Sequence, residues 1–395
     1  MKKGCIYCGN NPVPHTLVWI DTTLMVGANE LSRSRFGRWI PFNLSTKASD
    51  AFAHLLVRFL MRLRIMNIVD DIKRVRNDRG RVLWEEAKRR SIPFHALSFL
   101  GSVTDAYLTE VNGKEFMFNG LPKPPSQKAA WDFWIDDKTI VKRTLATAGI
   151  PVPRGGSAHT WRGAKAIFNS IDKPVVIKPR LGSRGRHTTT NISTLAELKV
   201  AYKRAKQLCI SIIVEEHLVG SVYRSTLIDG KSVGILRGDP PRVTGDGVHT
   251  IEQLVTKKNA ARHSRVAEVV LSDMHDQFLA AEGLTRGTIL SAGHTIDLIE
   301  KIGISYGGNS ADDTSTIHPD TVRVLERAAL PLGDSLVGID FIIPDITAPP
   351  VGQKWGITEC NACPFIDLHH DPVEGESRNA ASAVWNMVEK RIDEF

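Results

Sequence analysis

Three oxygen-bearing side chains towards the end of the chain have the types and the spacing of a metal site. Asp340 lies in the run GIDFIIPD, and Glu359 and Asn361 lie in GITECNACPF. Because side chains alternate between the two faces of a strand, Glu359 and Asn361 point to one face and Cys360 points back into the protein. Mg²⁺ prefers hard oxygen ligands and leaves its other positions to water and phosphate. The spacing predicts half of a Mg²⁺ site, with a solvated acidic sheet edge as the alternative for these residues alone.

Two strands must position this trio. Residues 337–343 and 355–361 are predicted strands, and the Pro-rich loop between them allows an antiparallel return. That pairing would bring Asp340 next to Glu359 and Asn361.

A lysine before a glycine-rich loop is a second candidate for chemistry. Residues 173–179 (KPVVIKP) predict a buried strand, and GSRG follows at 182–185. Glycine lets backbone N–H groups approach phosphate oxygens closely, and Lys178 in an apolar run requires an anionic partner or a route to solvent. GSRG is neither a P-loop nor a Rossmann fingerprint, so a tight surface turn remains the alternative.

Two arginines flank the clearest hairpin of the sequence. The Asp-Gly pair at 229–230 predicts a two-residue type I′ turn. Counting back from this turn pairs Arg224 with Ile235 and Val222 with Arg237, which would place both arginines on one face. We expect either a clamp for a phosphoryl group or carboxylate, or two solvated surface arginines.

Composition favours a globular protein with anionic partners. The 395 residues suffice for two or three domains, and 51 Lys+Arg against 43 Asp+Glu give a charge of +8. The basic residues are diffuse and not interleaved with aromatic ones, so a nucleic-acid partner is not expected. The apolar stretch 51–69 contains a histidine and three arginines, which predicts an amphipathic helix rather than a membrane span.

Five cysteines and the start MKKGCIYCGNNPVP, which has no apolar secretory segment, favour a cytoplasmic location. Cys5 and Cys8 have the spacing of half a zinc knuckle, and Cys360 and Cys363 form a second C-x-x-C pair. The pairs are too far apart for a local finger, so buried or free thiols are favoured and metal binding stays open.

The chain changes character along its length. Residues 1–125 mix short apolar segments with basic helices, and the run GKEFMFNGLPKPPSQ at 113–127 is predicted to be a boundary. A helix is predicted over 131–148, followed by alternating elements typical of an α/β protein. Among these are a helix over 194–207 and a strand over 211–215.

The order of these motifs resembles the ATP-grasp ligases, most closely the ATP-grasp domain of cyanophycin synthetase and of bifunctional glutathione synthetases. The resemblance covers about residues 136 to 390 and includes VVIKP, VEEHLVGSVYR, GDGVHTIEQLV and SYGGNSADDTSTIHPD. It implies an α/β (α+β) ATP-grasp fold, in which two α+β subdomains grip ATP after a smaller N-terminal α/β region. The expected domains are residues 1–125, 126–218 and 219–395.

The resemblance also implies roles for individual residues. Lys142 and Lys178 match phosphate-binding lysines, Arg224 and Arg237 match arginines that face the reacting phosphate, and Arg378 matches an arginine near the substrate. Asp340, Glu359 and Asn361 match the metal ligands. The remaining nucleotide-binding positions, from the mobile loop and the adenine hinge, are Gly182, Ser183, Gly185, Glu215, Glu216, His217 and Leu218. Val222 replaces an acidic residue of the family, which puts the ribose contact in doubt.

The implied activity is an ATP-dependent carboxylate–amine ligase that joins an amino acid or peptide carboxylate to an amine through an acyl phosphate, releasing ADP and phosphate. ATP and Mg²⁺ are the implied cofactors, with two ions expected and Mn²⁺ as a substitute. The expected partners are amino-acid or peptide substrates and no membrane, and the family admits a homo-oligomer. The alternatives are a small-molecule phosphotransferase of the same fold and a nucleotide-binding module without ligase activity.

Overall fold

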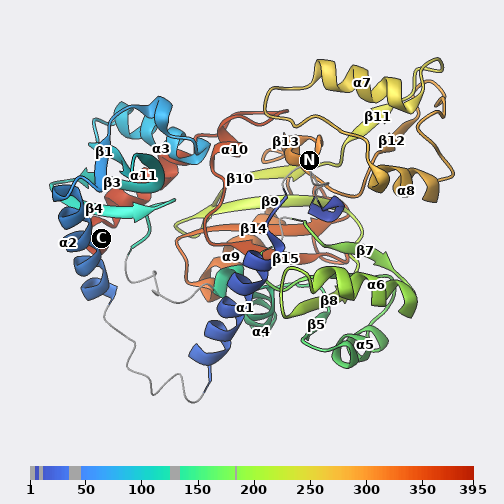
Figure 1. Ribbon diagram of the computed structural model, residues 1–395, viewed down its shortest axis with the longest axis horizontal. Coiled ribbons are helices and arrows are strands. Elements are labelled where there is room, and N and C mark those ends of the chain that lie inside the picture. The colour runs from blue at the N-terminus through green and yellow to red at the C-terminus, as the bar shows by residue number, and fades with distance from the viewer. Residues whose placement is uncertain (1–4, 9–11, 35–45, 125–133, 183–184) are drawn as a thin grey trace.

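A five-stranded antiparallel sheet forms the centre of the molecule (Figure 1). The computed structural model describes residues 5–8, 12–34, 46–124, 134–182 and 185–395. In spatial order the strands are β13 (Ser310–Asp312), β10 (Lys231–Gly238), β9 (Ser221–Ile228), β14 (Leu336–Ile343) and β15 (Gly356–Asn361). The predicted return of β15 antiparallel to β14 is confirmed.

Two helices cover one face of this five-stranded sheet. They are α4 (Lys138–Thr147) and α9 (Pro319–Leu332). Apolar side chains of both helices share a core with strand residues such as Phe341 and Tyr223, whose rings stack 5.5 Å apart. Helix α9 starts with a proline at its first position and ends at Gly333, whose φ of 63° suits a glycine C-cap. One face of the sheet is therefore closed by core, and chemistry is left to the other face.

A second sheet, here called the middle sheet, carries the predicted glycine loop. Its strands, in spatial order, are β5 (Gly155–Ala158), β8 (Ile212–Glu216), β6 (Val175–Pro179) and β7 (Thr189–Ile192). Helices α5 (Trp161–Ser170) and α6 (Leu195–Ala205) pack on it through a shared apolar core. Thr194 and Glu197 form a capping box that starts α6, close to the predicted boundary. The strands and the helix predicted in this region are confirmed.

A third, N-terminal sheet contains β1 (Met66–Val69), β2 (Phe94–Phe99), β3 (Ser102–Val111) and β4 (Lys114–Asn119). Helices α3 (Asp78–Arg89) and α11 (Ala380–Lys390) share its core, where the buried Trp385 donates a hydrogen bond to the Leu83 carbonyl at 3.0 Å. One prediction fails here, because the helix predicted over 51–69 ends at Arg62 in α2 (Thr46–Arg62) before β1 begins. The stretch 113–127 includes β4, whose alternating phenylalanines are buried, and the domain boundary expected there stays a prediction.

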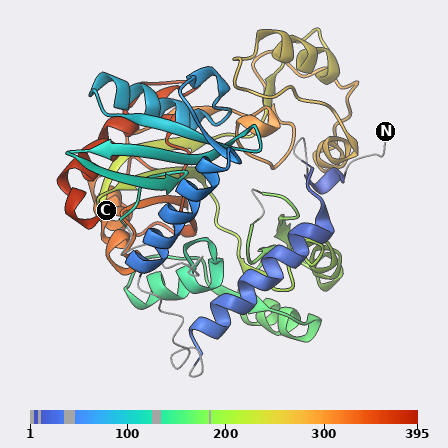
Figure 2. The same cartoon turned by 60° about the vertical axis from the view of Figure 1, so that its left-hand side comes forward.

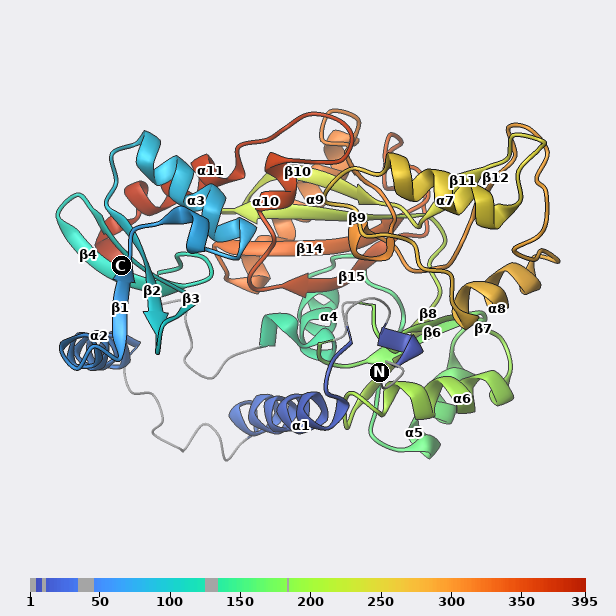
Figure 3. The same ribbon diagram turned by 45° about the horizontal axis from the view of Figure 1, so that its top comes forward.

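Helix α1 (His15–Ser32) lies along the middle sheet and α4, away from the N-terminal sheet (Figures 2 and 3). Thr22 of this helix donates a hydrogen bond to the Leu208 carbonyl at 2.7 Å, and Val26 packs against Leu181 and Cys209. The first helix of the chain is therefore a support for the middle sheet.

The remaining elements form a small unit at one end of the molecule and short connecting turns. The unit has its own apolar core and contains β11 (Arg242–Thr244), α7 (Ile251–Ala261), α8 (Asp273–Ala281) and β12 (Thr295–Asp297). The connecting turns are η1 (Ile6–Cys8), η3 (Ile72–Arg74), η5 (Trp134–Asp136), η6 (Ile304–Tyr306), α10 (Asp367–His370) and η7 (Ile392–Glu394). Among the described residues, none of the helices has the length and the apolar character needed to cross a membrane.

The hairpin of β9 and β10 has the predicted turn but a different register. Both turn residues at 229–230 have positive φ, 50° and 78°, as a type I′ turn requires. The register then shifts between Ser232 and Gly234, where one extra residue is accommodated in β10.

This bulge moves the two arginines apart. Arg224 lies opposite Leu236, and Arg237 lies opposite Tyr223, instead of the predicted partners. Because directly paired residues share a face and neighbours alternate, Arg224 and Arg237 lie on opposite faces of the sheet. The expectation that both arginines form one clamp on one face is therefore wrong.

Candidate active site

The predicted acidic trio comes together at adjacent strands of the five-stranded sheet. Asp340 on β14 pairs directly with Glu359 on β15, and Asn361 pairs with Gly338 one step further along the same face. The Asn361 amide donates a hydrogen bond to Asp340 Oδ2 at 3.3 Å. Two carboxylates side by side at a buried position require a cation nearby.

Arg224 supplies one such cation from the neighbouring strand β9. Its guanidinium donates two parallel hydrogen bonds to Asp340, each at 2.6 Å. Burial raises the pKa of the Asp340 carboxyl, the Arg224 guanidinium opposes that rise, and the Glu359 carboxylate adds to it. Arg224 is thus positioned beside the carboxylates on the face that α4 and α9 leave uncovered.

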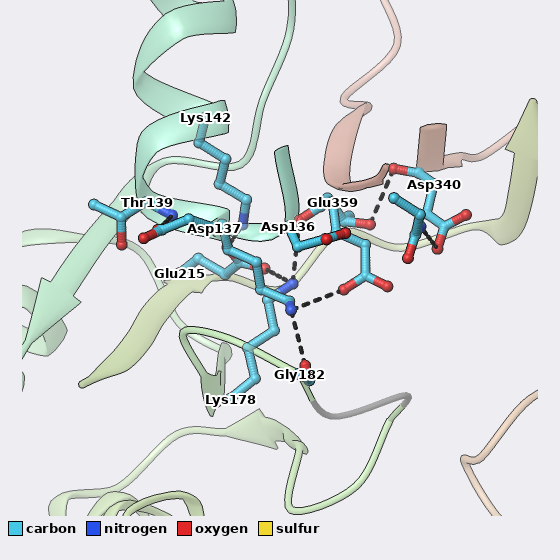
Figure 4. Close-up of polar contacts among 12 residues, drawn as sticks. Asp136, Asp137, Thr139, Lys142, Lys178, Gly182, Glu215, Asp340 and Glu359 are labelled. Atoms are coloured by element: carbon cyan, nitrogen blue, oxygen red, sulfur yellow. Dashed lines mark hydrogen bonds and ion pairs between the residues drawn. The ribbon is translucent and has the colours of Figure 1, made fainter. Parts of the chain in front are cut away.

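Lys142 from α4 and Lys178 from β6 converge on Glu215 of β8 (Figure 4). The Lys178 ammonium lies 2.8 Å from Glu215 Oε1, and all three side chains are buried or nearly so. Burial, together with the neighbouring lysines, lowers the pKa of Lys142 well below its ordinary value. Burial also lowers the pKa of Lys178 to about 8. A second anion next to these lysines would stabilise their charged forms.

Lys138, which the sequence reasoning missed, links the two halves of the site. Its ammonium lies 3.2 Å from Glu359 Oε2 and donates to the Gly182 carbonyl at 3.1 Å. Burial of Glu359 opposes its ionisation, but Lys138 and Lys178 outweigh this effect and lower its pKa to about 2. Lys138 lies four residues before Lys142 on α4, and residues four apart share one face of a helix. This spacing could have identified Lys138 as a site residue once Lys142 was predicted.

The glycine-rich loop is held at both described ends. Gly182 and Gly185 have φ values of 63° and 72°, which favour glycine, and Lys301 donates to the Gly185 carbonyl. The predicted site residue Ser183 lies outside the described residues. The loop therefore starts directly above the lysine cluster, with Lys138 attached to its first residue.

The four residues predicted as an adenine hinge divide between two environments. Glu215 points into the lysine cluster, while Glu216 contacts Arg154 and Lys354. The His217 amide donates to the Pro174 carbonyl at 3.1 Å, and Leu218 is buried. Of these four residues, only Glu215 therefore contacts Lys142 and Lys178.

The other two predicted arginines lie further out. Arg237, on the opposite face from Arg224, contacts Asp239 and Asp313 at 3.2 and 2.9 Å. Arg378 contacts Asp312 at 2.9 Å. Since Asp312 pairs with Leu236, which in turn pairs with Arg224, the partner of Arg378 lies on the same face as Arg224. Of the two, the geometry connects Arg378 to the site.

A buried ion pair fixes α4 against the middle sheet. Asp137 caps α4 by accepting from two backbone amides, and its carboxylate also accepts from Arg180 at 2.9 and 3.0 Å. Asn29 of α1 donates to the same carboxylate at 3.1 Å. The helix that carries Lys138 and Lys142 is therefore tied to α1 and to the residue that follows β6.

The two C-x-x-C pairs do not share a site. Cys360 belongs to the core beneath the five-stranded sheet, and the Cys363 carbonyl accepts from Arg79 of the N-terminal unit at 3.1 Å. Cys5 and Cys8 instead lie beside the middle sheet, within 3.5 Å of His187.

Comparison with known proteins finds similar sequences and similar structures. A cyanophycin synthetase from Crocosphaera subtropica is 32% identical over 312 residues, covering 77% of this chain and 35% of the relative. The glutathione biosynthesis bifunctional protein GshAB of Mannheimia succiniciproducens is 29% identical over 272 residues, covering 64% of this chain and 35% of the relative. A bifunctional glutathione synthetase from Pasteurella multocida has a similar structure, with a TM-score of 0.56 and 23% identity over 78% of this chain and 43% of that one.

This chain has the ATP-grasp fold. The resemblance expected from the ordered motifs is confirmed, together with the expected α+β architecture. No protein-family model matches the chain. The chain spans 35% of the length of these two curated relatives. In ATP-grasp terms, the middle sheet and the five-stranded sheet are the two layers between which the lysines and carboxylates meet.

Proposed function

We propose that the protein is an ATP-dependent carboxylate–amine ligase that joins an amino acid or peptide carboxylate to an amine. One observation carries this proposal. Lysines from α4 and β6 lie against the strand pair that bears Asp340 and Glu359, so phosphate-binding and metal-binding groups meet between two sheets. Phosphoryl transfer depends mainly on such positioning and charge neutralisation.

The acidic trio fits a divalent metal. Asp340 and Glu359 offer hard carboxylate oxygens, and we propose the side-chain oxygen of Asn361, whose amide nitrogen contacts Asp340, as the third ligand. We propose Mg²⁺ at this position, as two ions with ATP bound and with Mn²⁺ as a substitute. The metal would neutralise charge on the phosphates.

The residues of the chain would divide the remaining work. Lys142 and Lys178 bind the α and β phosphates, the loop from Gly182 to Gly185 covers them, and Arg224 stabilises the γ-phosphoryl group in transfer. The backbone of residues 215–218 would receive the adenine edge. The proposed reaction requires no side-chain nucleophile.

The reaction would take place in two steps. A substrate carboxylate oxygen attacks the γ-phosphorus, ADP leaves, and an acyl phosphate forms. An amine then attacks the carbonyl carbon, phosphate leaves with the bonding electron pair, and the nitrogen loses its extra proton to give an amide. Closure of the loop would exclude water, which would otherwise hydrolyse the acyl phosphate.

The two remaining arginines, the domain limits, the oligomeric state and the location are treated separately. We assign Arg378 to the substrate carboxylate, and the role of Arg237 at the reacting phosphate stays a prediction that its position on the opposite face does not support. The domain limits at 125 and 218, a homo-oligomeric state and a cytoplasmic location also stay predictions.

The test is a substrate screen that follows ADP formation with a panel of amino acids and dipeptides, with mass spectrometry of the products. If the protein is a ligase, we expect ADP, free phosphate and an amide product in equal amounts. Asp340→Asn and Glu359→Gln should each lower the rate at least about 100-fold. Glu115→Gln, in an exposed ion pair with Arg58, is the matched control and should retain the rate.

Two results would overturn the proposal. Phosphate found on a stable organic product would indicate a phosphotransferase. Absence of Mg·ATP binding and of ADP formation with every substrate would rule out the ligase.

A further inference from the structure

Four metal-binding side chains from distant parts of the chain meet beside the middle sheet. Their ligand atoms, from Cys5, Cys8, His15 and His187, all lie within 4.8 Å of one another. The Cys5 and Cys8 sulfurs are each 3.5 Å from His187 Nε2, and the Cys8 sulfur is 3.2 Å from His15 Nε2. Cysteine thiolate and histidine imidazole are the ligands of tetrahedral zinc sites.

These separations match a tetrahedral metal. With zinc–sulfur and zinc–nitrogen bonds of about 2.3 and about 2.0 Å, a tetrahedral angle places sulfur and nitrogen about 3.5 Å apart. Two of the three separations equal this value and the third is slightly shorter. These three sulfur–nitrogen separations therefore have the dimensions of a tetrahedral coordination shell.

A hydrogen bond orients the His187 ring towards this cluster. His187 Nδ1 lies 2.8 Å from the Arg204 carbonyl oxygen, and since a carbonyl only accepts, Nδ1 carries the proton. The Nε2 atom is then the one with a lone pair, and it faces both sulfurs. Zinc-binding histidines are usually oriented by a hydrogen bond from the other ring nitrogen.

The backbone supports the same arrangement. The His187 amide donates to the Tyr7 carbonyl at 3.2 Å, and the Arg204 guanidinium lies 3.8 Å above the centre of the Tyr7 ring. The Cys8 amide donates to the Cys5 carbonyl at 3.0 Å, which closes the C-x-x-C turn. Both halves of the cluster are thus fixed by contacts outside the four side chains.

We infer that Cys5, Cys8, His15 and His187 form a structural Cys₂His₂ zinc site. Cys8 and His187 are fully buried, and four protein ligands complete the tetrahedron, which is typical of structural rather than catalytic zinc. Two thiolates also balance the charge of Zn²⁺.

The position of the site indicates which segments zinc would connect. His15 is the first residue of α1, and His187 follows the glycine-rich loop by two residues. Zinc would tie the start of the chain and α1 to the end of this loop, on the far side from Lys138. The site stands independently of the ligase proposal, because zinc content does not depend on activity.

The test measures zinc in the purified full-length protein by inductively coupled plasma mass spectrometry after removal of loosely bound metal. We expect about one zinc per chain, and loss of most of it in Cys5→Ser and in His15→Ala. Cys363→Ser, at an exposed cysteine outside the cluster, is the matched control and should retain the wild-type content.

Cobalt substitution keeps the test decisive if these variants do not fold. Wild-type protein reconstituted with Co²⁺ should show the intense visible bands of tetrahedral cobalt and thiolate charge-transfer absorption. An octahedral cobalt spectrum, a Cys5–Cys8 disulfide in place of metal, or zinc that persists in both ligand variants would overturn the inference.

Discussion

The buried pair of Asp137 and Arg180 permits a sharp prediction about how α4 is held. The Asp137 carboxylate is fully buried, caps α4 and accepts from Arg180, whose side chain is only 3% exposed. Asp137→Asn keeps an oxygen that can cap the helix but removes the charge. Asp137→Ala removes both. The difference between the two variants therefore separates the cap from the ion pair.

The expected losses follow from the contacts. Removing one partner of a buried ion pair costs about 3–5 kcal/mol, because the other charge stays buried. Arg180 keeps a second partner, since it also contacts Glu30 at 2.5 Å, so we expect a loss near the lower limit, about 3 kcal/mol, for Asp137→Asn. Loss of the cap adds about 1 kcal/mol in Asp137→Ala.

Urea unfolding followed by circular dichroism measures these losses. Because the denaturant slope increases with protein size, a loss of about 3 kcal/mol should lower the urea midpoint of this 395-residue chain by about 1 M or less. Arg180→Met alone should also destabilise, while the double variant with Asp137→Asn should lose less than the sum, since no charge then remains unpaired. Asp172→Asn, in an exposed ion pair with Arg154, is the control and should leave the midpoint unchanged.

The reasoning would be refuted if Asp137→Asn matched the wild type. It would also be refuted if the Asp137 and Arg180 losses were additive, since that would mean the two groups do not interact.

Three further predictions concern other parts of the molecule. The pKa of Glu359 is lowered to about 2, so its ion pairs stabilise the fold fully above its ordinary pKa of 4.5, and this stabilisation is lost as the pH falls towards 2. In Glu359→Gln, the free energy of unfolding should therefore fall less steeply between pH 4.5 and pH 2. Lys138→Met should lower the rate of ADP formation roughly 100-fold and speed hydrogen exchange near Gly182, while Lys138→Arg retains part of both, measured by coupled assay and mass spectrometry. Trp385→Ala should cost about 3–5 kcal/mol in urea unfolding, and Trp385→Phe clearly less, because the ring fills the core between α11 and the N-terminal sheet.

The meeting of Asp340, Glu359 and Asn361 was predictable because it depends on two strands joined by a short connection. Alternation along one strand placed Glu359 and Asn361 on one face, and a short Pro-rich connection allowed the return that puts Asp340 beside them. The turn at 229–230 was predictable for the same reason, since a two-residue Asp-Gly connection has few conformations.

The register of the same hairpin was not predicted correctly, because counting assumed an uninterrupted ladder. A bulge next to Gly234 adds one residue, and a shift of one residue moves a side chain to the other face. A glycine inside a strand is a known sign of such a bulge, so Gly234 was the available warning. The consequence is chemical: Arg224 is left as the arginine beside Asp340, and Arg237 is removed from that face.

The cysteine-histidine cluster shows where sequence patterns cannot suffice. The C-x-x-C spacing of Cys5 and Cys8 predicts two ligands. The other two are His15, at the start of α1, and His187, which lies 179 residues after Cys8 in the chain. His187 reaches the cluster only because β6, the glycine-rich loop and α6 fold into the middle sheet, and because Arg204 on α6 orients its ring. No period or motif encodes that meeting. The same folding step brings Lys178 to Glu215, so the proposed phosphate-binding lysines and the proposed zinc site both depend on the correct placement of the segment between β6 and α6.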